Sequence, residues 1–185
     1  MKSVMQHQFS QAPSADIPRS SFNRTSGHKT TIDAGYLVPI YIDEVLPGDT
    51  FNMRPTVFAR INTPLYPLMD NLYADLHWFF VPVRQIWDNF RKMMGEQIDP
   101  GDSIDYSVPT KTIAAGCAEG SLYDYLGIPT QITNTVINIL PIRAYQHVYN
   151  EWYRDQNLIN SADISTADGP DTTTDVTLQI VTGKP

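Results

Sequence analysis

The stretch GYLVPIYIDEVLPGDTF, residues 35–51, joins a β-prone run to a sharply turned acidic corner. Residues 35–42 predict a strand, and Pro39 places it at an edge or a strand entry because proline cannot donate a ladder hydrogen bond. The corner that follows is built from Asp43, Glu44, Pro47, Gly48 and Asp49. It holds turn formers but no histidine, cysteine, serine or lysine, so these residues alone suggest no chemistry and leave open whether the corner is a site or part of the architecture.

Two further strands are predicted beyond the corner. Residues 49–61 alternate in part between apolar and polar side chains, with Pro55 marking a bend. Residues 72–83, LYADLHWFFVPV, are dense in aromatic and branched side chains, which is the strongest strand pattern in the chain.

The next segment, residues 84–96, predicts a helix. Its apolar side chains recur at helical spacing, and Gly95 is a suitable residue at which to end it. Residues 95–120 then predict a long irregular connection, and such loops in compact domains usually bind or line something.

Two more helices are predicted in the second half. Residues 121–129 predict a short helix capped by Ser121 and stopped by Gly127. Residues 141–157 predict a longer one, because they open on proline and carry an aromatic stripe. Strands followed by helices and long loops, without a βαβ rhythm, indicate an antiparallel β scaffold with helical excursions.

Charge divides the chain into a basic arm and an acidic body. Residues 1–30 carry four basic residues against Asp16 alone, a balance of +3. Residues 31–185 carry nine basic and nineteen acidic residues, a balance of −10. The polar composition of residues 1–30 predicts an extended arm, which is either a solvated tail or a segment that contacts a polyanion through its phosphates.

The C-terminal tract, residues 160–185, is acidic and rich in threonine. It predicts an exposed loop with a last strand over residues 176–181. Residues 1–22 hold no apolar region and predict no secretory signal, and the longest apolar runs are too short to span a bilayer. The single cysteine, Cys117, excludes a disulfide within the chain.

Catalytic and metal-binding patterns are nearly absent. No two of the four histidines fall at a metal-ligand spacing, and Cys117 has no nearby activating base in the sequence. Asp99, Asp102 and Asp105 could supply oxygen ligands to calcium, although their spacing differs from an EF-hand and equally fits a tight turn. The sequence therefore predicts no enzymatic activity and no cofactor.

Three blocks together resemble the N-terminal part of the major capsid protein of microviruses, and of the gokushovirus branch in particular. They are FNRTSGHKTTIDAGYLVPIYIDEVLPGDTF (22–51), FFVPVRQIWDNFRKMMGEQIDPGDS (79–103) and LPIRAYQHVYNEWYRDQNLI (140–159). The resemblance runs from Phe22 to Ile159 and keeps the family's order. Three matching blocks of this length are far more specific than a short motif.

The resemblance implies a mainly β fold, the viral jelly roll, an eight-stranded antiparallel barrel with helical and long-loop insertions. It implies that this chain covers only part of that barrel: an arm at 1–30, the N-terminal part of the capsid domain at 31–159, and the exposed tract at 160–185. The implied function is a major capsid protein whose sixty copies close a T=1 icosahedral shell around circular single-stranded DNA, in a virion assembled in the host cytoplasm.

The resemblance also implies partners for named residues. Arg19, Arg24 and Lys29 would face the genome or a scaffold protein, and Asp43, Glu44, Pro47, Gly48 and Asp49 would form a barrel turn or meet a neighbouring subunit. Other virion proteins and a host-surface receptor are further expected partners, and no membrane is implied.

Two other functions remain as alternatives at this point. A jelly-roll module that binds host-surface carbohydrate through aromatic-lined loops would share the fold, but it would need no basic arm. A calcium-dependent or glycoside-cleaving enzyme would depend on Asp99, Asp102 and Asp105, so replacing all three with alanine would abolish its activity.

Overall fold

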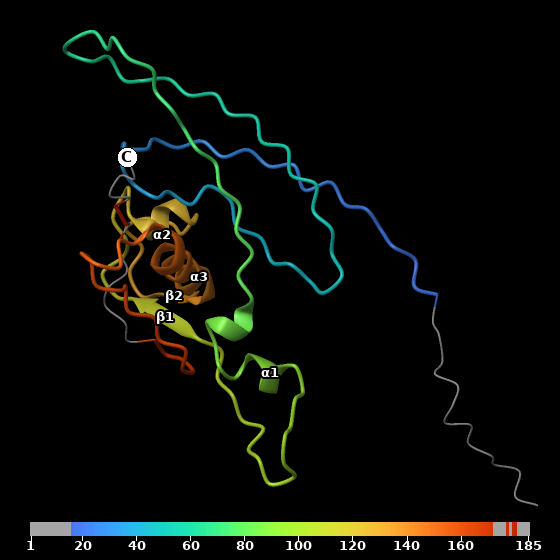
Figure 1. Cartoon of the computed structure of the whole chain (residues 1–185). Helices are drawn as coiled ribbons and strands as arrows, with labels where there is room; N and C mark the ends of the chain where they lie inside the picture. Colours follow the sequence, from blue (N-terminus) through green and yellow to red (C-terminus); the bar gives the residue numbers. More distant parts are fainter. Residues whose placement is uncertain (1–15, 172–176, 178, 181–185) are drawn as a thin grey trace, which may run out of the picture.

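The computed structural model describes residues 16–171, 177, 179 and 180. A small core is surrounded by long extended segments (Figure 1). Its elements are η1 (Val83–Gln85), α1 (Phe90–Met93), β1 (Thr110–Ile113), α2 (Leu122–Tyr125), β2 (Thr135–Asn138), α3 (Leu140–Val148) and the π-helical turn η2 (Tyr149–Tyr153). The described chain is thus mostly non-helical.

Helix α3 is the centre of the hydrophobic core. Ile142 and Tyr145 of α3 pack with Leu122 of α2 and with Ile139, which immediately precedes α3. All four are buried, and Leu122 and Ile142 are almost fully so. Of the stripe predicted for this helix, Tyr145 and Tyr149 are buried as amphipathic spacing requires, whereas Trp152 is 67% exposed.

Strands β1 and β2 form a two-stranded antiparallel sheet, with Thr110 opposite Asn138 and Ile113 opposite Thr135. The irregular connection predicted for residues 95–120 was therefore wrong over β1. The strand TKTI is rich in β-branched residues, but it is only four residues long and Pro109 directly precedes it. Its partner lies more than twenty residues away, beyond the reach of a local pattern.

The strands predicted at 35–42, 49–61 and 72–83 are extended but not paired into a sheet within the described residues. One antiparallel bridge joins Tyr36 to Ile180. A strand also needs a hydrogen-bonded neighbour, and among the described residues only Tyr36 and Leu37 of segment 35–42 have one, in residues 179 and 180. The described residues as a whole form one sheet of two strands, β1 and β2, and not a barrel.

The helix predicted at 84–96 is interrupted between η1 and α1. The carbonyl of Ile86 accepts a hydrogen bond of 3.0 Å from the Arg143 guanidinium, and the Asp88 amide donates to the carbonyl of Thr166. These tertiary bonds occupy groups that a continuous helix would have used. The predicted end is confirmed, since the amide of Gly95 donates to Lys92 after the last turn.

The two later helices were predicted correctly, apart from the end of the second one. The Ser121 hydroxyl accepts from the amide of Asp124 and caps α2, and the Gly127 amide bonds back to Asp124 where α2 ends. Pro141 lies in the first turn of α3. The helical backbone ends at Tyr153 rather than at residue 157, because Arg154 is already extended.

The acidic tract was predicted to be exposed, and over residues 162–171 this is wrong in part. Ala162 is buried, and the Asp171 side chain is only 2% exposed because it pairs with Arg143. Half of the strand predicted at 176–181 lies outside the described residues, which include only residues 177, 179 and 180 of it. Of these, Gln179 accepts a backbone hydrogen bond from Leu37.

Candidate functional site

The acidic corner, residues 41–49, is a tight turn. The amide of Asp49 donates to the carbonyl of Leu46 at 3.1 Å, and the Leu46 amide donates to the Asp49 carboxylate at 3.0 Å. Pro47 and Gly48 occupy the two central positions, and Gly48 has φ 87°. Proline followed by a residue with positive φ is the pattern of a type II turn, which explains why this sequence bends here.

Asp43 gathers three hydrogen-bond donors at the entrance of the turn. Its carboxylate accepts from the Arg24 guanidinium at 2.7 Å, from the Tyr41 hydroxyl at 2.7 Å and from the amide of Glu44 at 2.9 Å. The hydrogen bond to Asp43 raises the pKa of the Tyr41 hydroxyl. The Asp43 side chain is only 11% exposed, and these three donors hold its carboxylate in place.

Arg19 and Arg24 meet the acidic corner in the folded chain. Besides the ion pair of Arg24, Arg19 donates to the carbonyl of Gly48 at 3.2 Å. Lys29 is exposed, and residues 1–15 of the predicted arm lie outside the described residues. The structure therefore brings together two sets of residues that the sequence had suggested separately, the arm cations and the corner acids.

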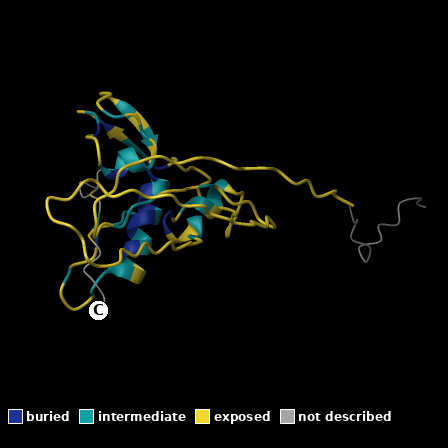
Figure 2. Ribbon diagram, turned by 90° about the horizontal axis from the view of Figure 1, so that it is seen from above, coloured by how far each residue is buried: buried dark blue, intermediate teal, exposed yellow. Residues whose placement is uncertain are grey.

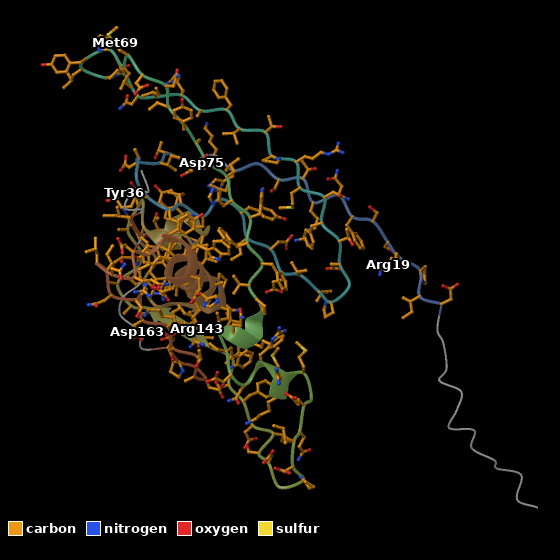
Figure 3. All side chains as sticks on the ribbon, in the orientation of Figure 1. Arg19, Tyr36, Met69, Asp75, Arg143 and Asp163 are labelled. Carbon is orange, nitrogen blue, oxygen red and sulfur yellow. The ribbon has the colours of Figure 1, made fainter. Side chains whose placement is uncertain are left out.

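A second feature is the extended apolar segment, residues 51–80. Large apolar side chains project from it into solvent, with Phe58 92% and Met69 96% exposed. Figure 2 shows the long extended segments almost wholly in the colour of exposed residues, and Figure 3 places Met69 at a tip far from Arg143. Exposed apolar surface of this extent is typical of an interaction surface rather than of a surface that stays in contact with water.

One end of this segment forms an aromatic cluster with η2. The rings of Phe79 and Trp152 lie 5.7 Å apart, and His77 stacks on Tyr153 at 5.9 Å. The Tyr153 hydroxyl also lies 2.7 Å from Nδ1 of His77, so this histidine nitrogen has a partner. Sequence reasoning missed the cluster, although both contributing stretches, HWFF and EWY, were visibly aromatic.

The third feature is a buried polar centre around Arg143. Its Nε donates to the Asp171 carboxylate, and its two terminal nitrogens donate to the carbonyls of Ile86 and Ala167, each at 3.0 Å. Figure 3 shows Arg143 inside the core region. No local pattern indicated this arginine, because its partners lie 24 to 57 residues away.

Beside this centre, Trp87 donates through its indole nitrogen to Asp168 at 2.7 Å, and the Ser107 amide donates to the other carboxylate oxygen at 3.0 Å. The Trp87 bond is the main cause of the lowered pKa of Asp168. Together, Asp168 and Asp171 attach the acidic tract to Trp87 after η1, to the segment before β1 and to α3.

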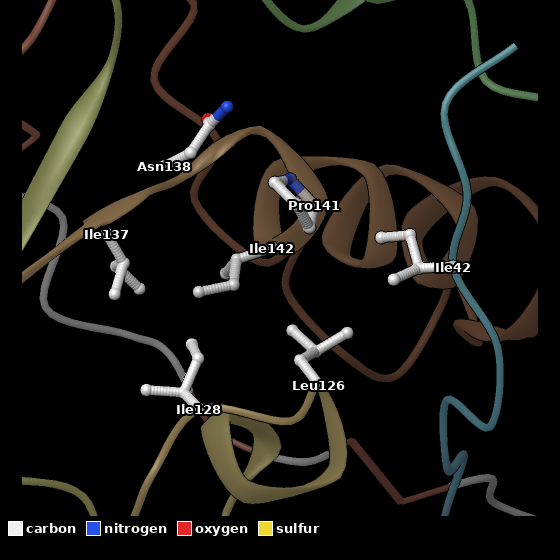
Figure 4. A pocket seen from close by; sticks show the side chains of 7 residues that line it. All are labelled: Ile42, Leu126, Ile128, Ile137, Asn138, Pro141 and Ile142. Atoms are coloured by element: carbon white, nitrogen blue, oxygen red, sulfur yellow. The ribbon is translucent and has the colours of Figure 1, made fainter. Parts of the chain in front are cut away.

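An apolar pocket of about 250 Å³ lies beside α3. Figure 4 shows the side chains that line it, which are Ile42, Leu126, Ile128, Ile137, Asn138, Pro141 and Ile142. Asn138 supplies the one polar side chain among them. The lining offers no acid, base or nucleophile for chemistry.

The described residues contain no cluster of three or more histidine, cysteine or acidic side chains that could hold a metal ion. The candidate calcium ligands instead form local turns, in which Asp102 accepts from the amide of Asp99 and Asp105 accepts from Ser103. The buried Cys117 thiol donates to the carbonyl of Pro129 at 3.2 Å. Over the same residues, no helix is long and apolar enough to cross a membrane.

Comparison with known proteins gives consistent results. A capsid protein VP1 of Bdellovibrio phage phiMH2K is 50% identical over 174 residues, which is 94% of this chain and 33% of the relative. The VP1 of Chlamydia phage 1 is 44% identical, over 91% of this chain and 29% of the relative. The VP1 of Spiroplasma virus 4 is 34% identical, over 97% of this chain and 34% of the relative.

The chain spans about a third of the length of these relatives. The family model described as capsid protein (F protein) matches residues 10–184, which is nearly the whole chain. This match and the three VP1 relatives confirm the resemblance to microvirus capsid proteins. The chain therefore belongs to the capsid protein (F protein) family.

Proposed function

We propose that this chain is part of a structural capsid protein whose copies assemble into a T=1 icosahedral shell around circular single-stranded DNA. The observation that carries the proposal is the extended apolar segment, residues 51–80, with its large side chains in solvent. Family membership gives the structural role, and the exposed segment gives a physical reason for association.

Burial of this segment would supply the driving force for association. Apolar surface contributes roughly 25 cal/mol per Å² when it leaves water, and aromatic side chains dominate protein interfaces. Phe58, Tyr66 and Tyr73 are each more than four-fifths exposed in the single chain. Contact with other copies, or with the rest of a longer capsid protein, would bury such side chains.

The proposed architecture is the viral jelly roll. Residues 35–42, 49–61 and 72–83 are extended and β-prone, so each is suited to pair with a further strand of an eight-stranded barrel. Residues 49–61 and 72–83 have no sheet neighbour among the described residues, which makes them poor surface segments for a protein that remains a monomer. The acidic corner would then be one of the turns of the barrel.

The proposed genome contact lies in the basic arm. Arg19, Arg24 and Lys29 are the cations of its described part, and guanidinium groups bind phosphate with good geometry. The body is strongly acidic, so the arm is the natural place for polyanion contact. Such contacts would be independent of base sequence and would weaken with salt.

Residence in the virion, assembly in the host cytoplasm, and contacts with other virion or scaffold proteins belong to the same proposal. It includes no catalytic activity, cofactor or membrane. Neither the apolar pocket nor the turns at residues 99–105 offers the chemistry of an enzyme.

Electron microscopy of the expressed full-length capsid protein tests the proposal. Uniform small icosahedral shells are expected, and shells from infected cells should show the ultraviolet absorbance of packaged nucleic acid. Discrete monomers or small rings would refute it.

A second candidate function is binding of host-surface carbohydrate by the aromatic cluster. Trp152 is 67% exposed and lies beside Phe79, and exposed aromatic faces can stack on apolar faces of sugars. Screening the protein against immobilised glycans, with Trp152→Ala as the comparison, tests this role. Binding that Trp152→Ala abolishes would support attachment, and binding that survives the substitution would remove the cluster from it.

A further inference from the structure

We propose that the acidic corner is a docking site for the basic arm and that it competes with nucleic acid for Arg24. In the free protein Arg19 and Arg24 of the arm lie on the corner, and polyanion binding draws them away. This inference rests on the proposed genome contact of the arm. It adds a named competitor within the same chain.

The corner is already organised to receive a cation. The Asp43 carboxylate is held by the Tyr41 hydroxyl and by the amide of Glu44, so its position does not depend on Arg24. Glu44 and Asp49 add two further negative charges nearby in sequence. A fixed, partly desolvated carboxylate binds a guanidinium better than a freely moving one does.

In the ion pair with Asp43, the Arg24 side chain remains largely exposed to solvent. Its side chain is 63% exposed while that of Asp43 is 11% exposed. One of its terminal nitrogens donates to Asp43, and a guanidinium has five N–H donors. A phosphate can therefore approach Arg24 from solvent before the ion pair breaks, which is the geometry that an exchange requires.

The remaining contacts let the arm leave while its base stays fixed. Within the described part of the chain, Arg19 donates to the neutral carbonyl of Gly48, at 3.2 Å. At the other end, the Tyr125 hydroxyl of α2 donates to the carbonyl of Thr31 at 2.9 Å. Residues 16–30 are all exposed. Loss of the Asp43 contact would free the arm up to Thr31.

The balance of forces favours nucleic acid. The Arg24 side of the ion pair is 63% exposed, so water and salt screen the pair and weaken it. A polyanion offers many phosphates and releases counterions when arginine binds. While Arg24 is paired with Asp43, it is not available to the other acidic residues of the body. A polyanion then has to displace one carboxylate only.

Two substitutions in the full-length protein separate docking from polyanion binding. Asp43→Asn removes the corner anion, and Arg24→Gln removes the arm cation. Both should release the arm and speed tryptic cleavage after Arg19, measured without nucleic acid. Affinity for a fluorescent oligodeoxythymidine should move in opposite directions, rising by about two- to fivefold for Asp43→Asn and falling for Arg24→Gln.

Asp33→Asn is the matched control for charge. Asp33 is exposed and closely follows Lys29 in the sequence, and it makes none of the ion pairs found among the described residues. Its substitution changes net charge by the same amount as Asp43→Asn. It should leave both the cleavage rate and the oligonucleotide affinity close to those of the unchanged protein.

Unchanged cleavage in both variants would overturn the docking of the arm. Faster cleavage with equal oligonucleotide affinity in Asp43→Asn and the unchanged protein would overturn the competition. If either of these results is found while the unchanged protein still forms normal shells, this inference has failed but the proposed capsid function has not. Failure of the proposed capsid function would appear instead as absence of shells from the unchanged protein.

Discussion

At the scale of single residues, the most consequential side chain is Arg143. It is 1% exposed and donates to one carboxylate and two backbone carbonyls. A buried charge is tolerated only when its hydrogen bonds are complete and its partner is present. The guanidinium of Arg143 therefore holds the end of η1 and the acidic tract against α3.

Replacing Asp171 with asparagine should destabilise the protein strongly. It leaves Arg143 charged and buried without its counter-ion, which costs about 3–5 kcal/mol of unfolding free energy in comparable sites. Chemical denaturation measures the change. Asp163→Asn, at an exposed position in the same tract, should stay within about 0.5 kcal/mol, and equal effects of the two would contradict the role of the ion pair.

Tyr145 is the second residue whose surroundings set a measurable property. Its hydroxyl donates to the carbonyl of Leu37 at 2.8 Å and accepts from the amide of Gln179 at 2.9 Å. Burial raises its pKa from 10.0 to about 12. The folded state therefore holds this proton more tightly than the unfolded state does.

The raised pKa of Tyr145 predicts a loss of stability at high pH. The contribution is complete below pH 10.0 and disappears as pH rises toward about 12. By linkage it amounts to roughly 2–3 kcal/mol. In denaturation curves recorded across this range, Tyr145→Phe should flatten the pH dependence, whereas Tyr73→Phe at an exposed position should leave the slope as it was.

At the scale of elements, the most important contact is the packing of residues 166–171 against the chain that leads into β1. Gly169 lies so close to the chain before β1 that an added Cβ would meet the amide nitrogen of Thr110 at 2.7 Å and the carbonyl oxygen of Val108 at 2.8 Å. These are backbone atoms, which cannot rotate away. The close approach holds the acidic tract beside the sheet.

Gly169→Ala should therefore push the tract away from β1. Overpacking of this kind costs about 1–3 kcal/mol. The unfolding free energy, read from intrinsic tryptophan fluorescence, tests this because Trp87 is bound to the same tract through Asp168. Gly101→Ala has open space around its Cβ and should behave as the unchanged protein, so a similar loss there would argue against the steric cause.

At the scale of the whole molecule, a small core carries far more exposed apolar chain than a stable monomer needs. The core lies around α2, α3 and the sheet, while residues 51–80 run outside it (Figure 1). The fold of the core and the association of the protein should therefore respond to different substitutions.

Phe58→Ser should prevent shell formation without unfolding the core. Phe58 is 92% exposed, so its loss removes a contact only in the assembly. Electron microscopy should show few shells, while circular dichroism of the subunit stays unchanged. Phe58→Leu keeps an apolar side chain and should retain shells, and normal shells from Phe58→Ser would remove this residue from the interface.

Local rules account for the parts of the fold that were predicted correctly. The cap at Ser121, the end of α2 near Gly127 and the turn at Pro47–Gly48 each depend on groups within about four residues. The family itself was recognisable because three blocks matched in order. These features could be read from residue type and spacing alone.

The failures share one cause, which is a partner distant in sequence. The break after Ile86 needs Arg143, the pairing of β1 needs β2, and the burial of Asp171 needs α3. In the candidate site, the meeting of Arg24 with Asp43 joins residues 19 positions apart. Charge alone had suggested two separate surfaces there.

The sequence by itself thus determined the family, the helices α2 and α3 and the acidic turn, because neighbouring residues decide those features. Only the tertiary structure decided which buried charges pair, where the first helix breaks and where the basic arm lies. Such contacts depend on how the whole chain packs, since desolvation and hydrogen bonding act between atoms that are close in space whatever their distance in sequence.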